Sequence, residues 1–262
     1  MIDLRFQDGV YELTLQSAPL NEIGSEMLAA LEGALEEIDA EAGHALILHS
    51  GLERGFCAGA DLREMHREIT APGRSEADRQ ADLQEFIDRI HGVMNALDEL
   101  PMTTIAAIHG VCFGGGLELA LTADLRIAEP TARFCFPELR LGIIPGFGGI
   151  PRLKRDVSNG LVRDLLLTGR SIHAKKALAA GLINQLVGAD KSLDAARMMA
   201  RQAGRFDPEA RRTAKRFMKP IPWEELEVEK DHFMRRALRP TVIESLSRFV
   251  ESEDIRPYLP GA

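Results

Sequence analysis

The chain has 262 residues, of which 45% are hydrophobic and 27% are charged. A chain of this length buries a sizeable core, and this composition excludes disorder over most of the length. The formal net charge of −8 argues against a general nucleic-acid binder, because such a protein needs a basic surface. We therefore expect one large domain with a small appendage.

Three cysteines, Cys57, Cys112 and Cys135, are odd in number and widely spaced, which is typical of free thiols in a reducing compartment. The first ten residues carry charged side chains and no apolar stretch, so we expect no signal peptide. No apolar run approaches about 18 residues, so we expect no membrane span. The sequence predicts a cytoplasmic protein, with a removed organellar transit peptide as the alternative left open.

Strand and helix patterns alternate over the first 190 residues. Short apolar or alternating runs predict strands at 10–16, 45–49, 103–109, 125–128, 132–136 and 183–187. Apolar residues at helical spacing predict helices at 25–40, 77–100 and 114–121. Ser25 and Asp61 are predicted helix caps, and Glu64 stands at the third helical position after Asp61. This alternation of strands and helices predicts an α/β domain.

The chain beyond about residue 200 has helical patterns throughout. Its apolar positions exceed what a lone helical hairpin can bury, so we expect this tail to pack on the main domain or on a neighbouring subunit. We divide the chain into a core at 1–200 and a helical C-terminal region at 201–262.

Three glycine-containing segments, at 56–61, 114–118 and 142–149, are candidates for a binding site. The first two lie between a predicted strand and a predicted helix, where glycine permits close approach of the backbone to a ligand. A helix start also supplies unpaired N–H groups and the positive end of the helix dipole. Two such junctions side by side would direct two N–H donors at one oxygen, as in an oxyanion hole. For each segment taken alone, tight helix–strand packing is the simpler interpretation.

Two carboxylates stand at or near these glycine-containing segments. Glu118 lies in the first turns of the helix after the triple glycine, where a purely structural role beside the helix N-terminus is the alternative. Glu138 precedes an apolar run, and its alternative roles are a solvated loop acid or a partner of Arg140. The seven histidines show no HExxH or HxH pairing, so we expect no metal site. The sequence contains no GxSxG elbow, which argues against a serine hydrolase of the common α/β type.

Taken together, four stretches in this order resemble the crotonase, or enoyl-CoA hydratase/isomerase, family. They are FCAGADL at 56–62, IAAIHG at 105–110 with GGGLELA at 114–120, FPE at 136–138 with LGIIPGFGG at 141–149, and TGR at 168–170 with Ala177 and GLIN at 181–184. The resemblance implies a crotonase-like spiral of ββα units with an all-helical C-terminal region that mediates trimer contacts. It also implies a homotrimer or a dimer of trimers.

The resemblance also implies roles for single residues. Glu118 and Glu138 match the two catalytic acids, and the amides of Ala60 and Gly115 match the two oxyanion-hole donors. The residues that match the substrate and coenzyme A site are Ala58, Gly59, Ala60, Asp61, Leu62 and Gly146, the last of these near the catalytic water. The implied partner is an acyl-CoA thioester, with no nucleic acid and no membrane. No separate cofactor is implied, because coenzyme A is part of the substrate.

The implied activity is that of an enoyl-CoA hydratase, which reversibly adds water across the 2,3 double bond of a 2-enoyl-CoA. Glu138 is expected to donate the proton to C2, while Glu118 holds and activates the water. Two neighbouring carboxyls in a dry pocket do not both ionise easily, so we expect one to retain a proton. The alternatives are an isomerase, a specialist dehydratase, a decarboxylase or a hydrolase of the same fold, or a scaffold without turnover.

Several positions depart from the family pattern. The loop at 17–21 has no basic residue, so Arg63 is the candidate for contacts to the coenzyme A phosphates. Phe147 is bulkier than the usual residue there and is expected to narrow the pocket. The segment at 256–260 lacks the usual terminal apolar helix.

Overall fold

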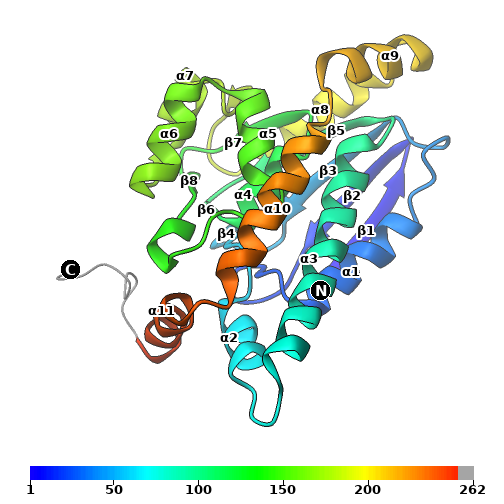
Figure 1. Ribbon diagram of the computed structural model, residues 1–262. Coiled ribbons are helices and arrows are strands. Elements are labelled where there is room, and N and C mark those ends of the chain that lie inside the picture. The colour runs from blue at the N-terminus through cyan, green and yellow to red at the C-terminus, as the bar shows by residue number, and fades with distance from the viewer. Residues whose placement is uncertain (253–262) are drawn as a thin grey trace.

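The computed structural model describes residues 1–252, in which helices surround two β-sheets (Figure 1). The larger sheet has six strands in the order β1-β2-β3-β5-β7-β10. These strands are β1 (Ile2–Gln7), β2 (Val10–Leu15), β3 (Ala45–Ser50), β5 (Thr103–Ile108), β7 (Leu125–Ala128) and β10 (Gln185–Leu186). β1 runs antiparallel to β2, and all the other neighbours in this sheet are parallel.

The smaller sheet consists of very short strands in the order β4-β6-β8-β9. They are β4 (Gly55–Cys57), β6 (Val111–Phe113), β8 (Arg133–Cys135) and β9 (Ile172–His173). Strands β3, β5 and β7 of the larger sheet are each followed by β4, β6 or β8 of the smaller sheet, and then by a helix. This strand–strand–helix repeat confirms the predicted spiral of ββα units.

The helices carry the chain between the strands and cover the sheets (Figure 1). They are α1 (Ser25–Glu36), α2 (Leu62–Thr70), α3 (Glu76–Glu99), α4 (Gly115–Leu121), the 3-10 helix η1 (Glu138–Leu141), α5 (Gly149–Asp156), α6 (Asn159–Thr168), α7 (Ala174–Ala179), α8 (Ser192–Ala203), α9 (Pro208–Met218), α10 (Trp223–Ala237) and α11 (Pro240–Glu251).

One of the two predicted helix caps is confirmed and the other is wrong. Asp61 caps α2, because its side chain accepts hydrogen bonds from the amides of Arg63 and Glu64. Ser25 is instead the first residue of α1, after Gly24 at the N-cap. Its hydroxyl and amide both donate to the Glu64 carboxylate of α2, so a partner 39 residues away replaces the local cap.

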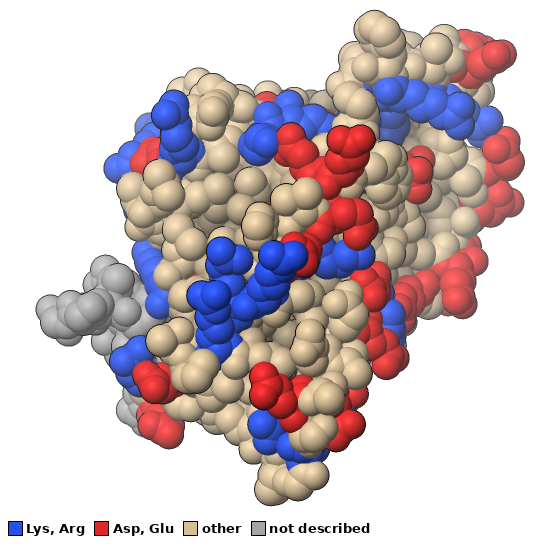
Figure 2. Space-filling model, in the orientation of Figure 1, with Lys and Arg blue, Asp and Glu red and all other residues tan. Residues whose placement is uncertain are grey.

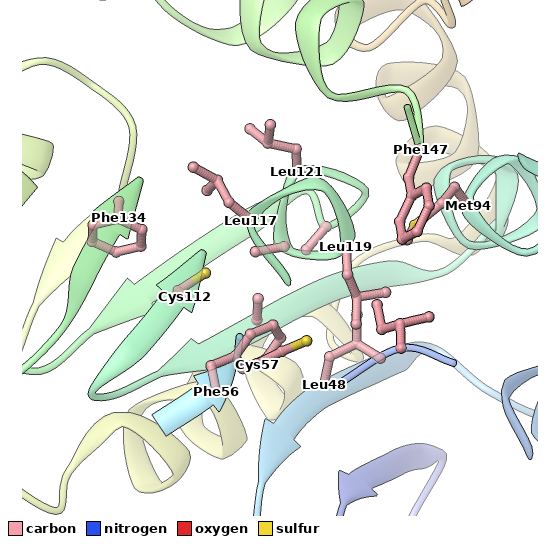
Figure 3. Packing of buried hydrophobic residues seen from close by; sticks show 14 of the residues in the cluster. Leu48, Phe56, Cys57, Met94, Cys112, Leu117, Leu119, Leu121, Phe134 and Phe147 are labelled. Carbon is pink, nitrogen blue, oxygen red and sulfur yellow. The ribbon is translucent and has the colours of Figure 1, made fainter. Parts of the chain in front are cut away.

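The core lies between the sheets and around α4, whose seven residues are all buried. Figure 3 shows Leu117, Leu119 and Leu121 of this helix among buried side chains that include Phe56 and Phe134 of the smaller sheet. Apart from Glu118, every residue of α4 is apolar or glycine, and such a helix is typical of a core. The three cysteines are buried free thiols, as expected, and burial raises the pKa of Cys57 to about 12.

The helical tail packs on the main domain through α10 and α11. α10 contacts α3 and α5, whereas α11 contacts α2 and η1. α9 differs from them, because none of its residues is buried and the Phe217 side chain is 89% exposed. The predicted division at residue 200 falls within α8 and stays a prediction, and the segment at 256–260 lies outside the described residues. Within residues 1–252 no helix is both long enough and apolar enough to cross a membrane.

Candidate active site

The residues that the sequence assigned to the site all border one cavity of about 410 Å³. They are Ala58, Gly59, Ala60, Asp61, Leu62, Gly115, Glu118, Glu138 and Gly146. The loop before α2, the start of α4, η1 and the segment before α5 all meet at this cavity, with α3 and Phe233 of α10 completing its walls. The spiral therefore brings together segments that are up to 88 residues apart in the sequence (from Ala58 to Gly146).

The two glycine loops lie against each other at the cavity. Gly59 has a φ of +104°, and a Cβ built there would lie 3.0 Å from the Gly115 nitrogen. A Cβ on Gly115 would in turn lie 3.4 Å from the Ala60 nitrogen. Within residues 1–252, neither the Ala60 amide nor the Gly115 amide donates a hydrogen bond to another residue. Two neighbouring donors without protein acceptors are the arrangement that an oxyanion hole requires.

Glu118 reaches from α4 towards the segment that precedes α5. Its side chain is buried, and its Oε1 accepts hydrogen bonds of 2.8 Å from the amides of both Phe147 and Gly149. Burial raises the pKa of Glu118 to about 7, although the two amides oppose this shift by stabilising the carboxylate. Such a carboxyl changes its protonation state near neutral pH, which suits a general base.

Glu138 begins η1 and is also buried, which excludes the alternative role of a solvated loop acid. Its Oε2 accepts no hydrogen bond within the described part of the chain. Burial raises the pKa of Glu138 well above its usual range, and the negative charge of Glu118 raises it further. Arg140, the residue considered as a structural partner of Glu138, donates to the Gly169 carbonyl. A buried carboxyl with an unused oxygen at a cavity is a candidate proton donor.

Further buried polar residues border this site, and the sequence reasoning missed them. Arg152 is fully buried and donates to Asp98, to Asn95 and to the carbonyls of Phe147 and Gly148. His91 Nε2 lies 2.9 Å from the Gly146 carbonyl oxygen. A carbonyl only accepts hydrogen bonds, so this nitrogen carries the hydrogen. These side chains bind the carbonyls of the segment that precedes α5.

Glu229 of α10 is a further buried carboxyl near this site that the sequence did not reveal. It is buried, and its two oxygens accept 2.7 Å hydrogen bonds from the amides of Gly148 and Ile150. Burial raises its pKa well above the usual range, and the charge of Glu118 adds to the shift. The acidic neighbours Glu224, Glu225 and Glu227 make this stretch look like a solvated helix face, so no local signal marks Glu229.

One side of the cavity is apolar. It is lined by Met65, Ile69, Leu83, Phe86, Ile87 and Phe147. The Phe147 ring lies directly beside Gly115, where a Cβ would be 2.7 Å from its Cε2, and its centroid is 6.0 Å from that of Phe86. Phe147 therefore occupies space in the cavity next to Gly115, in line with the expected narrowing of the pocket.

Arg63, the candidate for phosphate contacts, is engaged elsewhere. Its guanidinium donates to the Val250 carbonyl and lies 6.0 Å from the centroid of the Phe249 ring. These contacts join α2 to α11. Figure 2 shows other basic side chains gathered across the end of α10 and the start of α11, where Arg235 and Arg239 are exposed.

Comparisons with known proteins support the family and the fold. The model of the enoyl-CoA hydratase/isomerase family matches residues 5–256. Over 210 residues the chain is 37% identical to "Probable enoyl-CoA hydratase 2, mitochondrial" of Arabidopsis thaliana, and the match spans 79% of this chain and 66% of that protein. It is 38% identical over 196 residues to "Probable enoyl-CoA hydratase" of Rhizobium meliloti (strain 1021), spanning 75% of this chain and 72% of the relative.

Solved structures show the same architecture. The enoyl-CoA hydratase of Bacillus anthracis superposes with a TM-score of 0.74 at 31% identity, covering 95% of this chain and 96% of that one. The enoyl-CoA hydratase of Bacillus halodurans reaches a TM-score of 0.82 over 94% and 98% of the two chains, and at 23% identity it supports the fold alone. The fold and cavity thus define an α/β protein of the crotonase fold. The chain belongs to the enoyl-CoA hydratase/isomerase family.

Proposed function

We propose that this protein is an enoyl-CoA hydratase, which reversibly adds water to the 2,3 double bond of a 2-enoyl-CoA thioester. One observation carries the proposal: the buried carboxyls of Glu118 and Glu138 border the same cavity as the amides of Ala60 and Gly115, which have no acceptor among residues 1–252. The family and its relatives' names support an acyl-CoA thioester as the substrate.

In the proposed mechanism the two amides hold the thioester oxygen. Attack of water at C3 moves electrons towards that oxygen, and preorganised N–H donors stabilise the resulting enolate. Glu118 accepts a proton from the water as its oxygen bonds to C3, and Glu138 gives its proton to C2. The proton on Glu118 then returns to Glu138 through solvent, which restores both groups.

The different pKa values of the two glutamates support this division of roles. A pKa of about 7 leaves Glu118 substantially ionised at neutral pH, as a base must be. The pKa of Glu138 lies well above its usual range, so this carboxyl keeps the proton that a donor needs. The apolar side of the cavity, which includes Leu83 and Phe86, suits a hydrocarbon acyl group.

The direct test is hydration of crotonyl-CoA, followed by loss of the ultraviolet absorbance of the conjugated thioester. Glu138→Gln is expected to lower kcat by about 10²–10⁴-fold, because it removes the proton donor while preserving shape. The exposed Glu53→Gln serves as a matched control with wild-type activity. If Glu138→Gln hydrates crotonyl-CoA at the wild-type rate, Glu138 is not the proton donor and the proposed function is wrong. A Δ3–Δ2 isomerase commonly retains only one of the two acids, so a panel of 2-enoyl and 3-enoyl thioesters separates that alternative.

We further propose that the protein acts in the cytoplasm as a homotrimer or a dimer of trimers assembled through its C-terminal region. The exposure of Phe217 and Met218 on α9 supports such an assembly, since exposed apolar side chains of this size are typical of interfaces. Light scattering of the purified protein gives its mass in solution, and a monomeric mass would contradict the assembly.

A further inference from the structure

Four consecutive amides before and within α5 are shared alternately between two carboxyls. The amides of Phe147 and Gly149 donate to Glu118 at 2.8 Å, and those of Gly148 and Ile150 donate to Glu229 at 2.7 Å. Glu118 comes from α4, whereas Glu229 comes from α10 in the C-terminal region. Glu118 and Glu229 therefore bind the same short segment, 147–150.

Glu229 takes the place of a local helix cap. The first amides of a helix have no intrahelical acceptors, and side chains normally satisfy them. α5 has Gly148 at its N-cap, no side-chain cap and no acidic residue in its first turn. The amides of Gly148 and Ile150 depend on Glu229 for their acceptors.

Side chains also bind carbonyls beside and within the segment, at longer distances than the 2.7 to 2.8 Å of its amides. His91 binds the Gly146 carbonyl, and Arg152 binds those of Phe147 and Gly148. Removing Glu229 leaves two buried amides unsatisfied, and the segment must then move to find other acceptors. Such a movement displaces the Phe147 and Gly149 amides and the Glu118 carboxylate bound to them.

We propose that Glu229 is a positioning residue of the reaction: it fixes the 147–150 segment and thereby sets the orientation of Glu118 towards the substrate. This inference rests on the proposed hydratase function. It differs from a purely structural role because it predicts a loss in the chemical step, with substrate binding retained. The amides of Ala60 and Gly115 lie outside the 147–150 segment, and Glu229 accepts from Gly148 and Ile150 instead.

Steady-state kinetics on Glu229→Gln test the proposal. The substituted amide offers one acceptor oxygen but places an NH₂ group opposite the second backbone amide, so one hydrogen bond is lost. We expect kcat to fall by up to about 10²-fold, the effect of a small misplacement of a catalytic group, while KM changes little. Glu227→Gln is the matched control, since Glu227 lies on the same helix, is exposed and pairs with Lys230.

Hydrogen exchange of the Gly148 and Ile150 amides gives a second readout, which needs no turnover. Faster exchange at these amides in Glu229→Gln, and not in Glu227→Gln, supports the positioning role. Should the wild-type protein fail to hydrate any 2-enoyl-CoA while this exchange result holds, the hydratase proposal fails and the anchoring of the segment stands.

Glu229→Asp is a second variant, which keeps the test informative if Glu229→Gln does not fold. The aspartate keeps the charge but is one methylene shorter, so it cannot reach both amides, and the same loss confined to kcat is expected. The proposal is overturned by unchanged kcat and unchanged exchange, or by a rise in KM that accounts for the whole loss. It is also overturned if neither variant folds, because Glu229 is then a folding residue.

Discussion

The two proposed catalytic carboxyls, Glu118 and Glu138, border the same cavity but have opposite surroundings. Glu118 accepts two backbone amides, which stabilise its charge and moderate the effect of burial on its pKa. Glu138 has an oxygen without any partner within residues 1–252, and the charge of Glu118 works against its ionisation. Backbone amides, with a smaller contribution from the charge of Arg152, thus separate the pKa values of two like residues in one pocket.

The strongest test of this comparison removes both carboxyls. Glu118→Gln and Glu138→Gln are each expected to lower kcat by about 10²–10⁴-fold. If the two groups act as a unit, the double variant is little worse than the poorer single variant, because the second group has no function once the first is lost. Hydration kinetics on the four proteins measure this. Fully multiplicative losses would show that the glutamates act independently.

The pH dependence of kcat/KM tests whether Glu118 and Glu138 have different protonation states. Because Glu118 must be ionised to act as a base, the rate should fall about tenfold for each pH unit below its pKa of about 7. Glu138 must keep its proton, so a second fall is expected on the alkaline side, where this raised pKa is exceeded. A profile that stays flat between about pH 5 and pH 7 would contradict the role of Glu118 as the base.

A smaller effect concerns folding stability. The pKa of Glu118 is raised from 4.5 to about 7 in the folded protein, so the folded state binds this proton more tightly than the unfolded chain does. The resulting stabilisation is complete below the unfolded value and is lost as pH rises through the folded value. Glu118→Gln stays neutral, so its free energy of unfolding relative to wild type should rise by ~3 kcal/mol between about pH 4 and pH 8. Denaturant unfolding at the two pH values measures this difference, and an equal difference at both would contradict the raised pKa.

Much of the fold followed from the sequence where the pattern was long enough to read. The helix predicted at 77–100 lies at Glu76–Glu99, and the strand predicted at 45–49 lies at Ala45–Ser50. β4 and β6 were missed as strands because three residues are too few to show an alternation. These short strands form the smaller sheet, whose existence depends on long-range pairing that no local pattern records.

The candidate site was predictable to the extent that its residues stand in contiguous motifs. Gly59, Gly115 with Glu118, and Glu138 each lie within a short motif, and all of them border the cavity. Glu229 escaped notice because its function arises only when α10 crosses the start of α5. Ser25 was misjudged for a similar reason, since its partner Glu64 comes from another helix.

The contact between the two glycine loops also limits how this sequence can change. A Cβ on Gly116 would lie 2.3 Å from the Cys57 carbonyl oxygen, and one on Gly59 would lie 2.9 Å from that of Phe113. Both obstacles are backbone atoms, which cannot swing aside as a flexible side chain can. Even the smallest replacement, alanine, would push the loops apart. Lack of space alone therefore excludes a side chain at these two positions, whatever the surrounding pocket wall contains.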